Sequence, residues 1–180
     1  MLRYATFAFF VLAAAGSALA ADLKVGDPAP DFTLSASDGH TYTLSSFKGK
    51  QAVVLAWFPK AFTQGCTIEC RSLAKNGATI KKYDVTYFMA SVDPVEGEKG
   101  NKAFAESEKA DFPMLGDPTK ATATAYGVLN AERGFANRWT FYIAKDGTIA
   151  AIDKEVKPPT SAEDMVAKLA ELKVPPKNVL

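Results

Sequence analysis

The sequence QAVVLAWFPKAFTQGC, residues 51–66, contains both the predicted central strand and the candidate site. Residues 51–58 form a nearly continuous apolar run, which is typical of a buried central strand. Pro59 ends that strand, and a loop leads to Cys66 at the start of a helix predicted over residues 66–83. Backbone N–H groups and the positive end of the helix dipole meet there and favour a thiolate. The stretch therefore predicts a nucleophilic cysteine where a central strand gives way to a helix.

On both sides of this stretch, strands alternate with helices, which is the signature of a sheet covered by helices. Residues 31–34 and 41–44 flank an Asp-Gly turn and predict a β-hairpin. The remaining elements are strands over 84–92, 139–144 and 148–152, and helices over 95–110, 117–126 and 161–172, the last opening with the capping pattern Ser161-x-x-Asp164. A hairpin followed by βαβ and ββα units predicts an α/β protein with a thioredoxin-like fold: a central mixed β-sheet flanked by helices, with an N-terminal β-hairpin.

The composition limits the function classes. With 180 residues, 48% of them hydrophobic, the chain suits one compact domain with a substantial core. Its 21 basic and 20 acidic residues leave a net charge of +1. This balance lacks the basic excess of a nucleic-acid binder, so we expect no nucleic-acid partner.

The first twenty residues have the three parts of a secretory signal peptide. Arg3 supplies a positive start, residues 7–15 an apolar segment, and Ala18-Leu19-Ala20 a small-residue cleavage site. An uncleaved membrane anchor is the alternative, although the apolar run is short for a membrane span. We expect cleavage near Ala20/Ala21, a domain over residues 21–180, no stable membrane association afterwards, and a periplasmic or secreted protein.

The two cysteines, Cys66 and Cys70, are four residues apart on the predicted helix. In an oxidising compartment a structural disulfide is the default expectation for two cysteines. On a regular helix, however, Cβ atoms at this spacing lie roughly 5–6 Å apart, whereas a disulfide needs roughly 3.5–4.5 Å. A bond between them requires unwinding of the first helical turn, so a transient disulfide fits the spacing better than a permanent one.

Three residues around Cys66 carry a family resemblance. Pro59, Thr63 and Cys66 reproduce the Pro-x-x-x-Thr-x-x-Cys motif of peroxiredoxins, and Glu69 matches an acidic residue often found three positions later. The surrounding FPKAFTQGCT is similar to the PrxQ, or bacterioferritin-comigratory, branch of that family. The chain thus resembles a peroxiredoxin at its most specific motif.

The resemblance extends along the chain. The segment RWTFYI, starting at Arg138, resembles the Arg-x-Thr-Phe strand start that supplies the family's second active-site residue. The opening VGDPAPDFTL, residues 25–34, resembles the usual start of the domain. The likeness covers nearly all of residues 23–175, in the same order as in the family.

What the resemblance implies is a thiol peroxidase without a cofactor or metal. The Cys66 thiolate would attack hydrogen peroxide or an organic hydroperoxide and become a sulfenic acid. Arg138 would stabilise the negative charge, the Thr63 hydroxyl would donate to the sulfur or to a bound oxygen, and Pro59 would shield the site from water. Other interpretations stay open: a helix cap for Thr63, a plain strand end for Pro59, a surface ion pair for Arg138, and support of the first helical turn for Glu69.

Cys70 departs from the PrxQ pattern, in which a resolving cysteine stands five positions after the first. Two alternatives remain. Either Cys70 forms a disulfide with Cys66 that a thioredoxin-like donor reduces, or the enzyme has one functional cysteine and depends on an external thiol. The chain is expected to be a monomer or a homodimer.

Two other functions compete with this interpretation. A Cys-x-x-x-Cys spacing also occurs in the copper-binding Sco proteins, but those add a downstream histidine ligand, and the only histidine here is His40, upstream in the hairpin turn. Thiol–disulfide oxidoreductases carry Cys-x-x-Cys and usually a proline where this chain has Arg138 and Trp139. The preferred peroxide is also open, since four aromatic residues near the motif fit either a substrate approach or the core: Trp57, Phe58, Phe62 and Trp139.

Overall fold

The computed structural model describes residues 22–177. The predicted signal peptide, residues 1–20, lies outside the described residues. Within the described part, no helix combines the length and apolar character needed to cross a membrane.

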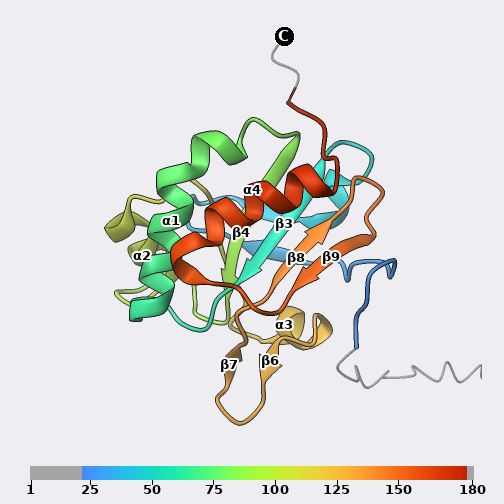
Figure 1. Cartoon of the computed structure of the whole chain (residues 1–180). Coiled ribbons are helices and arrows are strands. Elements are labelled where there is room, and N and C mark those ends of the chain that lie inside the picture. Colours follow the sequence, from blue (N-terminus) through green and yellow to red (C-terminus); the bar gives the residue numbers. More distant parts are fainter. Residues whose placement is uncertain (1–21, 178–180) are drawn as a thin grey trace, which may run out of the picture.

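A five-stranded mixed sheet forms the centre of the molecule, as predicted (Figure 1). Its strands, in spatial order, are β5 (Met114–Gly116), β4 (Val85–Ser91), β3 (Ala52–Trp57), β8 (Thr140–Ile143) and β9 (Ile149–Asp153). β3 pairs in parallel with β4 and antiparallel with β8. All six residues of β3 are buried, which explains why its sequence is a continuous apolar run.

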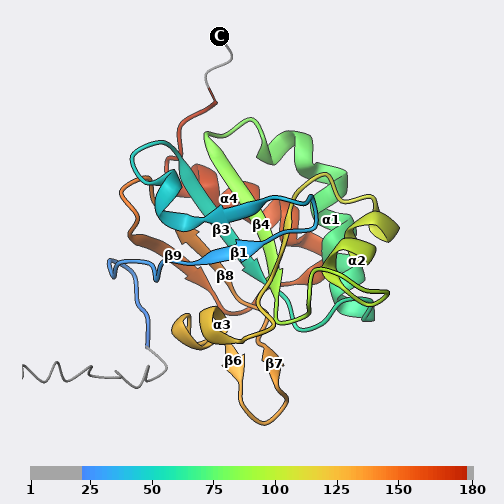
Figure 2. The same cartoon turned by 180° about the vertical axis from the view of Figure 1, so that it is seen from behind.

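Helices and a hairpin cover the two faces of the sheet. α1 (Gln64–Ile80) and α4 (Ser161–Glu171) lie across one face, with α2 (Asn101–Glu108) beside α1 (Figure 1). The other face carries the antiparallel hairpin of β1 (Thr33–Ser35) and β2 (Thr41–Thr43) and the short helix α3 (Ala121–Ala125) (Figure 2). The remaining elements are the 3-10 turns η1 (Leu44–Phe47) and η2 (Pro158–Thr160) and the hairpin β6 (Leu129–Asn130) and β7 (Phe135–Ala136).

Alternate residues of β3 serve two separate hydrophobic cores. Val54 and Ala56 pack under α1, α2 and α4, whereas Val53, Leu55 and Trp57 pack under the N-terminal hairpin and α3. Successive side chains of a strand point to opposite faces, so one strand can anchor both layers. The result is the predicted thioredoxin-like α/β fold.

Several predicted boundaries are wrong. The helix predicted over 95–110 covers only Asn101–Glu108, because the preceding residues turn and Gly97 has a φ of 98°. The helix predicted over 117–126 covers only Ala121–Ala125, after Lys120 in a left-handed conformation. α4 has Thr160 at its N-cap instead of Ser161, and the Thr160 hydroxyl donates to Asp164 at 2.7 Å.

Candidate active site

Cys66 is the third residue of α1, directly after the loop that follows β3. Thr63 precedes the helix in an extended conformation and provides its N-cap. The first N–H groups of an α-helix have no partner within the helix. Cys66 therefore lies among free backbone donors, and its side chain is 0% exposed.

Arg138 lies against Cys66. Its Nη2 donates to Sγ of Cys66 at 3.2 Å, and its Nη1 pairs with Oε2 of Glu69. The register of the sheet explains this position, because Ala56 near the end of β3 pairs with Thr140 at the start of β8. The two segments that carry the predicted site residues thus meet at one edge of the sheet.

Glu69 is a buried carboxylate, with a side chain that is 1% exposed. Burial raises its pKa to about 7, against the opposing effect of the Arg138 charge and hydrogen bond, and the negative charge of Asp153 adds to the rise. Burial alone would lower the pKa of Arg138, but Glu69 and Cys66 together raise it above its ordinary value. Glu69 and Arg138 therefore form a partly buried ion pair one helical turn from Cys66, not a solvated surface pair.

The Thr63 hydroxyl is occupied within the loop. It donates to the carbonyl oxygen of Lys60 at 2.8 Å, and it makes no side-chain cap to the helix backbone. Sequence reasoning assigned this proton to the sulfur or to a bound oxygen, whereas in the structure it is donated to a carbonyl three residues back. A hydroxyl that donates its proton keeps lone pairs to accept one.

The loop between β3 and α1 has an unusual backbone. Phe62 has a φ of 61°, which is rare for a bulky residue, and its side chain is 45% exposed. Its ring centroid lies 5.2 Å from that of the buried Phe104 of α2. Pro59, which ends the strand, is half-buried.

The four aromatic residues near the motif divide into two groups. Trp57 and Phe58 are core residues, whereas Phe62 is exposed and Trp139 is half-buried. The backbone N–H of Trp57 donates to the carbonyl of Trp139 at 2.8 Å. Nε1 of Trp57 is buried and finds no hydrogen-bond partner among residues 22–177. Only Phe62 and Trp139 can meet a molecule that approaches from solvent.

Cys70 is buried and is not disulfide-bonded to Cys66. Burial raises the pKa of the Cys70 thiol to about 12, and the negative charges of Glu108 and Glu69 add to the rise. The next residue, Arg71, pairs with Glu108 at the end of α2 through its Nε at 2.5 Å. Cys70 is therefore an inert thiol while α1 is intact.

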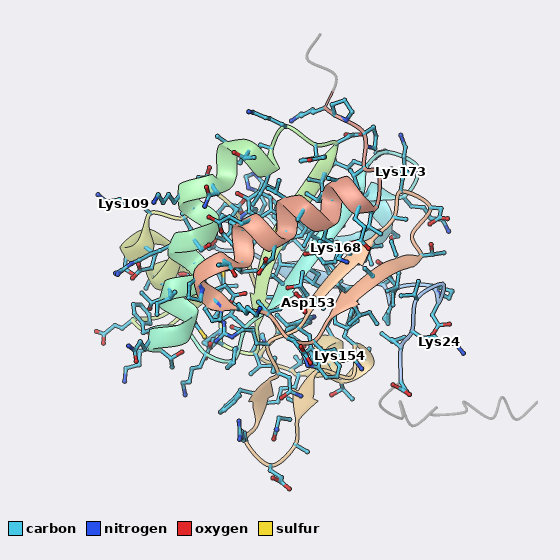
Figure 3. All side chains as sticks on the ribbon, in the orientation of Figure 1. Lys24, Lys109, Asp153, Lys154, Lys168 and Lys173 are labelled. Carbon is cyan, nitrogen blue, oxygen red and sulfur yellow. The ribbon has the colours of Figure 1, made fainter. Side chains whose placement is uncertain are left out.

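Gly65, Asp153 and Lys154 also lie near the site, and no sequence motif marked them as site residues. A Cβ atom at Gly65 would meet Nη2 of Arg138. Asp153 pairs in register with Thr140, and Nζ of Lys154 lies 4.3 Å from the centroid of the Trp139 ring. Figure 3 shows Asp153 and Lys154 at the end of β9. Strand register, which sequence patterns do not fix, brings these charges to the site.

Within the described residues, no group of three His, Cys, Asp or Glu side chains is placed to hold a metal ion. His40 lies in the hairpin turn, with its Nδ1 3.4 Å from the carboxylate of Asp38.

A thioredoxin-like fold with a cysteine at a helix start, held by an arginine from a neighbouring strand, defines a thiol-dependent redox enzyme. The comparisons with known proteins make the class specific. Residues 25–152 match the AhpC/TSA family. The chain belongs to this family and is a peroxiredoxin, that is, a thiol peroxidase.

Relatives of the chain agree with this assignment. It is 35% identical over 144 residues to alkyl hydroperoxide reductase E of Mycobacterium tuberculosis, covering 79% of this chain and 91% of the relative. It is 34% identical over 142 residues to peroxiredoxin Bcp of Escherichia coli, covering 75% of this chain and 88% of the relative. The crystal structure of peroxidoxin BcpB from Mycobacterium tuberculosis superimposes with a TM-score of 0.74 at 28% identity, covering 83% of this chain and 97% of that one.

Proposed function

We propose that this peroxiredoxin reduces hydrogen peroxide and organic hydroperoxides through Cys66 and resolves the product with Cys70. The observation that carries the proposal is the 3.2 Å contact between Nη2 of Arg138 and Sγ of Cys66. A fixed positive charge at this sulfur stabilises a thiolate and also the charge that develops on a departing oxygen. A structural cysteine has no need of such a partner.

In the first step, the Cys66 thiolate attacks the terminal oxygen of the hydroperoxide. The S–O bond forms as the O–O bond breaks, and the departing oxygen takes a proton to leave as water or an alcohol. Arg138 faces the charge on that oxygen, and the Thr63 hydroxyl, donating to Lys60, can accept a hydrogen bond from the peroxide. Cys66 is left as a sulfenic acid.

In the second step, the Cys70 thiolate attacks the sulfur of the Cys66 sulfenic acid. The S–S bond forms, the S–O bond breaks, and hydroxide leaves with a proton as water. Cys70 is buried on an intact helix, so the first turns of α1 must open before the sulfur atoms can meet. A thioredoxin-like dithiol then restores both cysteines by exchange. An exposed apolar side chain beside the site, that of Phe62, favours organic hydroperoxides as a second substrate class.

The test is the intact mass of the reduced protein, followed from milliseconds to seconds after one equivalent of hydrogen peroxide or of cumene hydroperoxide. Loss of two hydrogens supports the internal disulfide. Gain of one oxygen supports a peroxidase that depends on an external thiol, and would remove the resolving role from Cys70. A mass that stays constant for minutes would overturn the proposal.

Two matched variants assign the sulfur atoms. We expect Cys66→Ser to leave the mass unchanged, and Cys70→Ser to gain one oxygen at least as fast as the wild type loses two hydrogens. A fully active Cys66→Ser protein would remove Cys66 from the chemistry.

Export is a separate part of the proposal. The charge, apolar segment and cleavage site within residues 1–20 support it. The check is the N-terminal sequence of the protein recovered from cells that express the whole chain. A start near Ala21 in the periplasmic or culture fraction is expected, and an intact Met1 would contradict it.

A further inference from the structure

The loop that carries Pro59 and Thr63 is tethered by a side chain outside the proposed chemistry. The backbone N–H of Ala61, in the middle of this loop, donates to Oδ2 of Asp93 at 2.8 Å. Asp93 lies in the turn that follows β4, so it is remote from Ala61 in sequence. Ala61 is buried, and a buried N–H without a partner is costly. The contact therefore sets where the loop can lie.

Asp93 is itself held by the buried Ser91, which in turn contacts the buried Asn101, and we call Ser91, Asp93 and Asn101 the Asp93 hub. Oγ of Ser91 lies 3.1 Å from both Oδ2 of Asp93 and Oδ1 of Asn101. The backbone N–H of Asp93 donates to the same Ser91 Oγ at 3.1 Å. Nδ2 of Asn101 donates to the carbonyl of Leu115 at 2.9 Å. The hub thus joins the end of β4, the start of α2 and β5, which are rigid elements.

The tethered loop needs external support because its backbone is strained. A left-handed conformation is unfavourable for a residue such as Phe62, and such conformations persist only where the surroundings impose them. Two contacts flank this position: the hydrogen bond from Ala61 to Asp93, and the packing of the Phe62 ring on Phe104 of α2. Both come from the side of the molecule that carries the hub.

We propose that Asp93 is a positioning residue for the reaction of Cys66 with peroxide. By holding the Ala61 N–H it fixes residues 59–63, and with them the Thr63 hydroxyl, beside the thiol. The inference rests on the proposed function, because it concerns the rate of the peroxide step. Asp93 does not contact Cys66, so it acts only through the loop.

The proposal separates two reactions of the same thiol. A peroxide must be held with both oxygens in line with the sulfur, and a misplacement of about 1 Å costs roughly 100-fold in rate. Alkylation by iodoacetamide needs only the thiolate and access to it. Displacing the loop should therefore slow the first reaction and spare the second.

The experiment compares second-order rate constants of the reduced whole chain with hydrogen peroxide and with iodoacetamide. We expect Asp93→Ala to react with peroxide about 10–100-fold more slowly, with an alkylation rate near that of the wild type. Asp93→Asn should restore most of the peroxide rate, because its amide oxygen can accept from Ala61. The control is Asp31→Ala, which removes a carboxylate that tethers the Ser45 N–H at 2.9 Å in another part of the fold; its peroxide rate should match the wild type.

A wild-type peroxide rate in Asp93→Ala, or an equal loss in both reactions, would overturn the inference. Ser91→Ala provides a milder variant, because it loosens Asp93 without removing the tether, and it should show a smaller loss confined to peroxide. If Asp93→Ala does not fold, an unchanged peroxide rate in Ser91→Ala decides against the inference. A wild-type protein that reacts with peroxide no faster than free cysteine would instead overturn the proposed function, and the inference with it.

Discussion

A Cβ atom on Gly65 would lie 3.2 Å from Nη2 of Arg138, closer than about nine in ten such contacts in proteins. This is the nitrogen that donates to Sγ of Cys66. Gly65 has no positive φ, so its role is to leave space and not to permit a special backbone conformation. The absence of a side chain before the cysteine lets the guanidinium reach the sulfur.

Replacing Gly65 with alanine should slow the reaction with peroxide without lowering the free energy of unfolding. Alanine is favoured over glycine in a helix by up to about 1 kcal/mol, so the free energy of unfolding should not fall. The guanidinium must shift, and we expect the reaction of Cys66 with hydrogen peroxide to slow by about tenfold. Stopped-flow kinetics and urea unfolding measure the two effects, with Gln64→Ala in the same helical turn as the control. An unchanged rate would mean that Arg138 adapts without loss.

Removing the charge of Arg138 should affect both folding and chemistry. Arg138→Ala leaves Glu69 buried without its cation. Breaking a buried ion pair in this way lowers the free energy of unfolding by about 3–5 kcal/mol. The same substitution also removes the charge that faces the departing oxygen, for which we expect a loss of about 100–1000-fold in rate. Adding Glu69→Gln should recover part of the stability and none of the rate. Recovery of both together would show that Arg138 acts only by pairing with Glu69.

The raised pKa of Glu69 predicts a pH dependence of stability. The folded chain holds this proton up to a pKa of about 7, whereas the ordinary value is 4.5. Between these values the folded state binds a proton that the unfolded chain has lost, so the free energy of unfolding should fall as pH rises from about 4.5 to 7. Urea unfolding at several pH values, compared with Glu69→Gln, measures this. Parallel curves for the two proteins would contradict the prediction.

Neutralising Glu108 should speed the resolving step. Burial is the main cause of the high pKa of the Cys70 thiol, and the negative charge of Glu108 is the next largest. The ion pair between Glu108 and Arg71 also links α1 to α2. Such a partly exposed pair contributes about 1 kcal/mol at most, so Glu108→Gln should raise the rate of disulfide formation by up to about fivefold. Time-resolved intact mass gives this rate, and Glu106→Gln on the exposed side of α2 is the control. A slower or equal rate would show that the link does not restrain Cys70.

The central strand and the helix that follows it were predictable because their signals are local. The apolar run of β3 reflects burial on both faces of the sheet. Pro59 marks the end of that strand, and Cys66 follows after a short loop, within the first turn of α1. The whole-chain order of elements then led to the right fold. The start of α1 was missed by two residues, and the N-cap of α4 by one, although α4 begins at Ser161 as predicted.

The parts that failed depend on contacts distant in sequence or on very short elements. β5 has three residues, and β6 and β7 have two each, which is too short for a periodic pattern. The partner of the Thr63 hydroxyl depends on the shape of the loop. The tether from Ala61 to Asp93 depends on the parallel pairing of β3 and β4, which brings the two loops to one edge of the sheet.

Trp57 and Trp139, which are joined by a backbone hydrogen bond, give the enzyme an intrinsic fluorescence signal near the active site. These are the only two tryptophans of the chain. Trp57 ends β3, from which the chain leads to Cys66, and Trp139 stands between Arg138 and the first residue of β8. Trp57 is enclosed in the core, and Trp139 lies half-exposed beneath the Lys154 cation. Trp139 adjoins Arg138, whose contact with Cys66 is lost when α1 opens, whereas Trp57 packs on the opposite face of the sheet from α1. The intrinsic fluorescence of Trp139 should therefore follow each turnover in real time without any label.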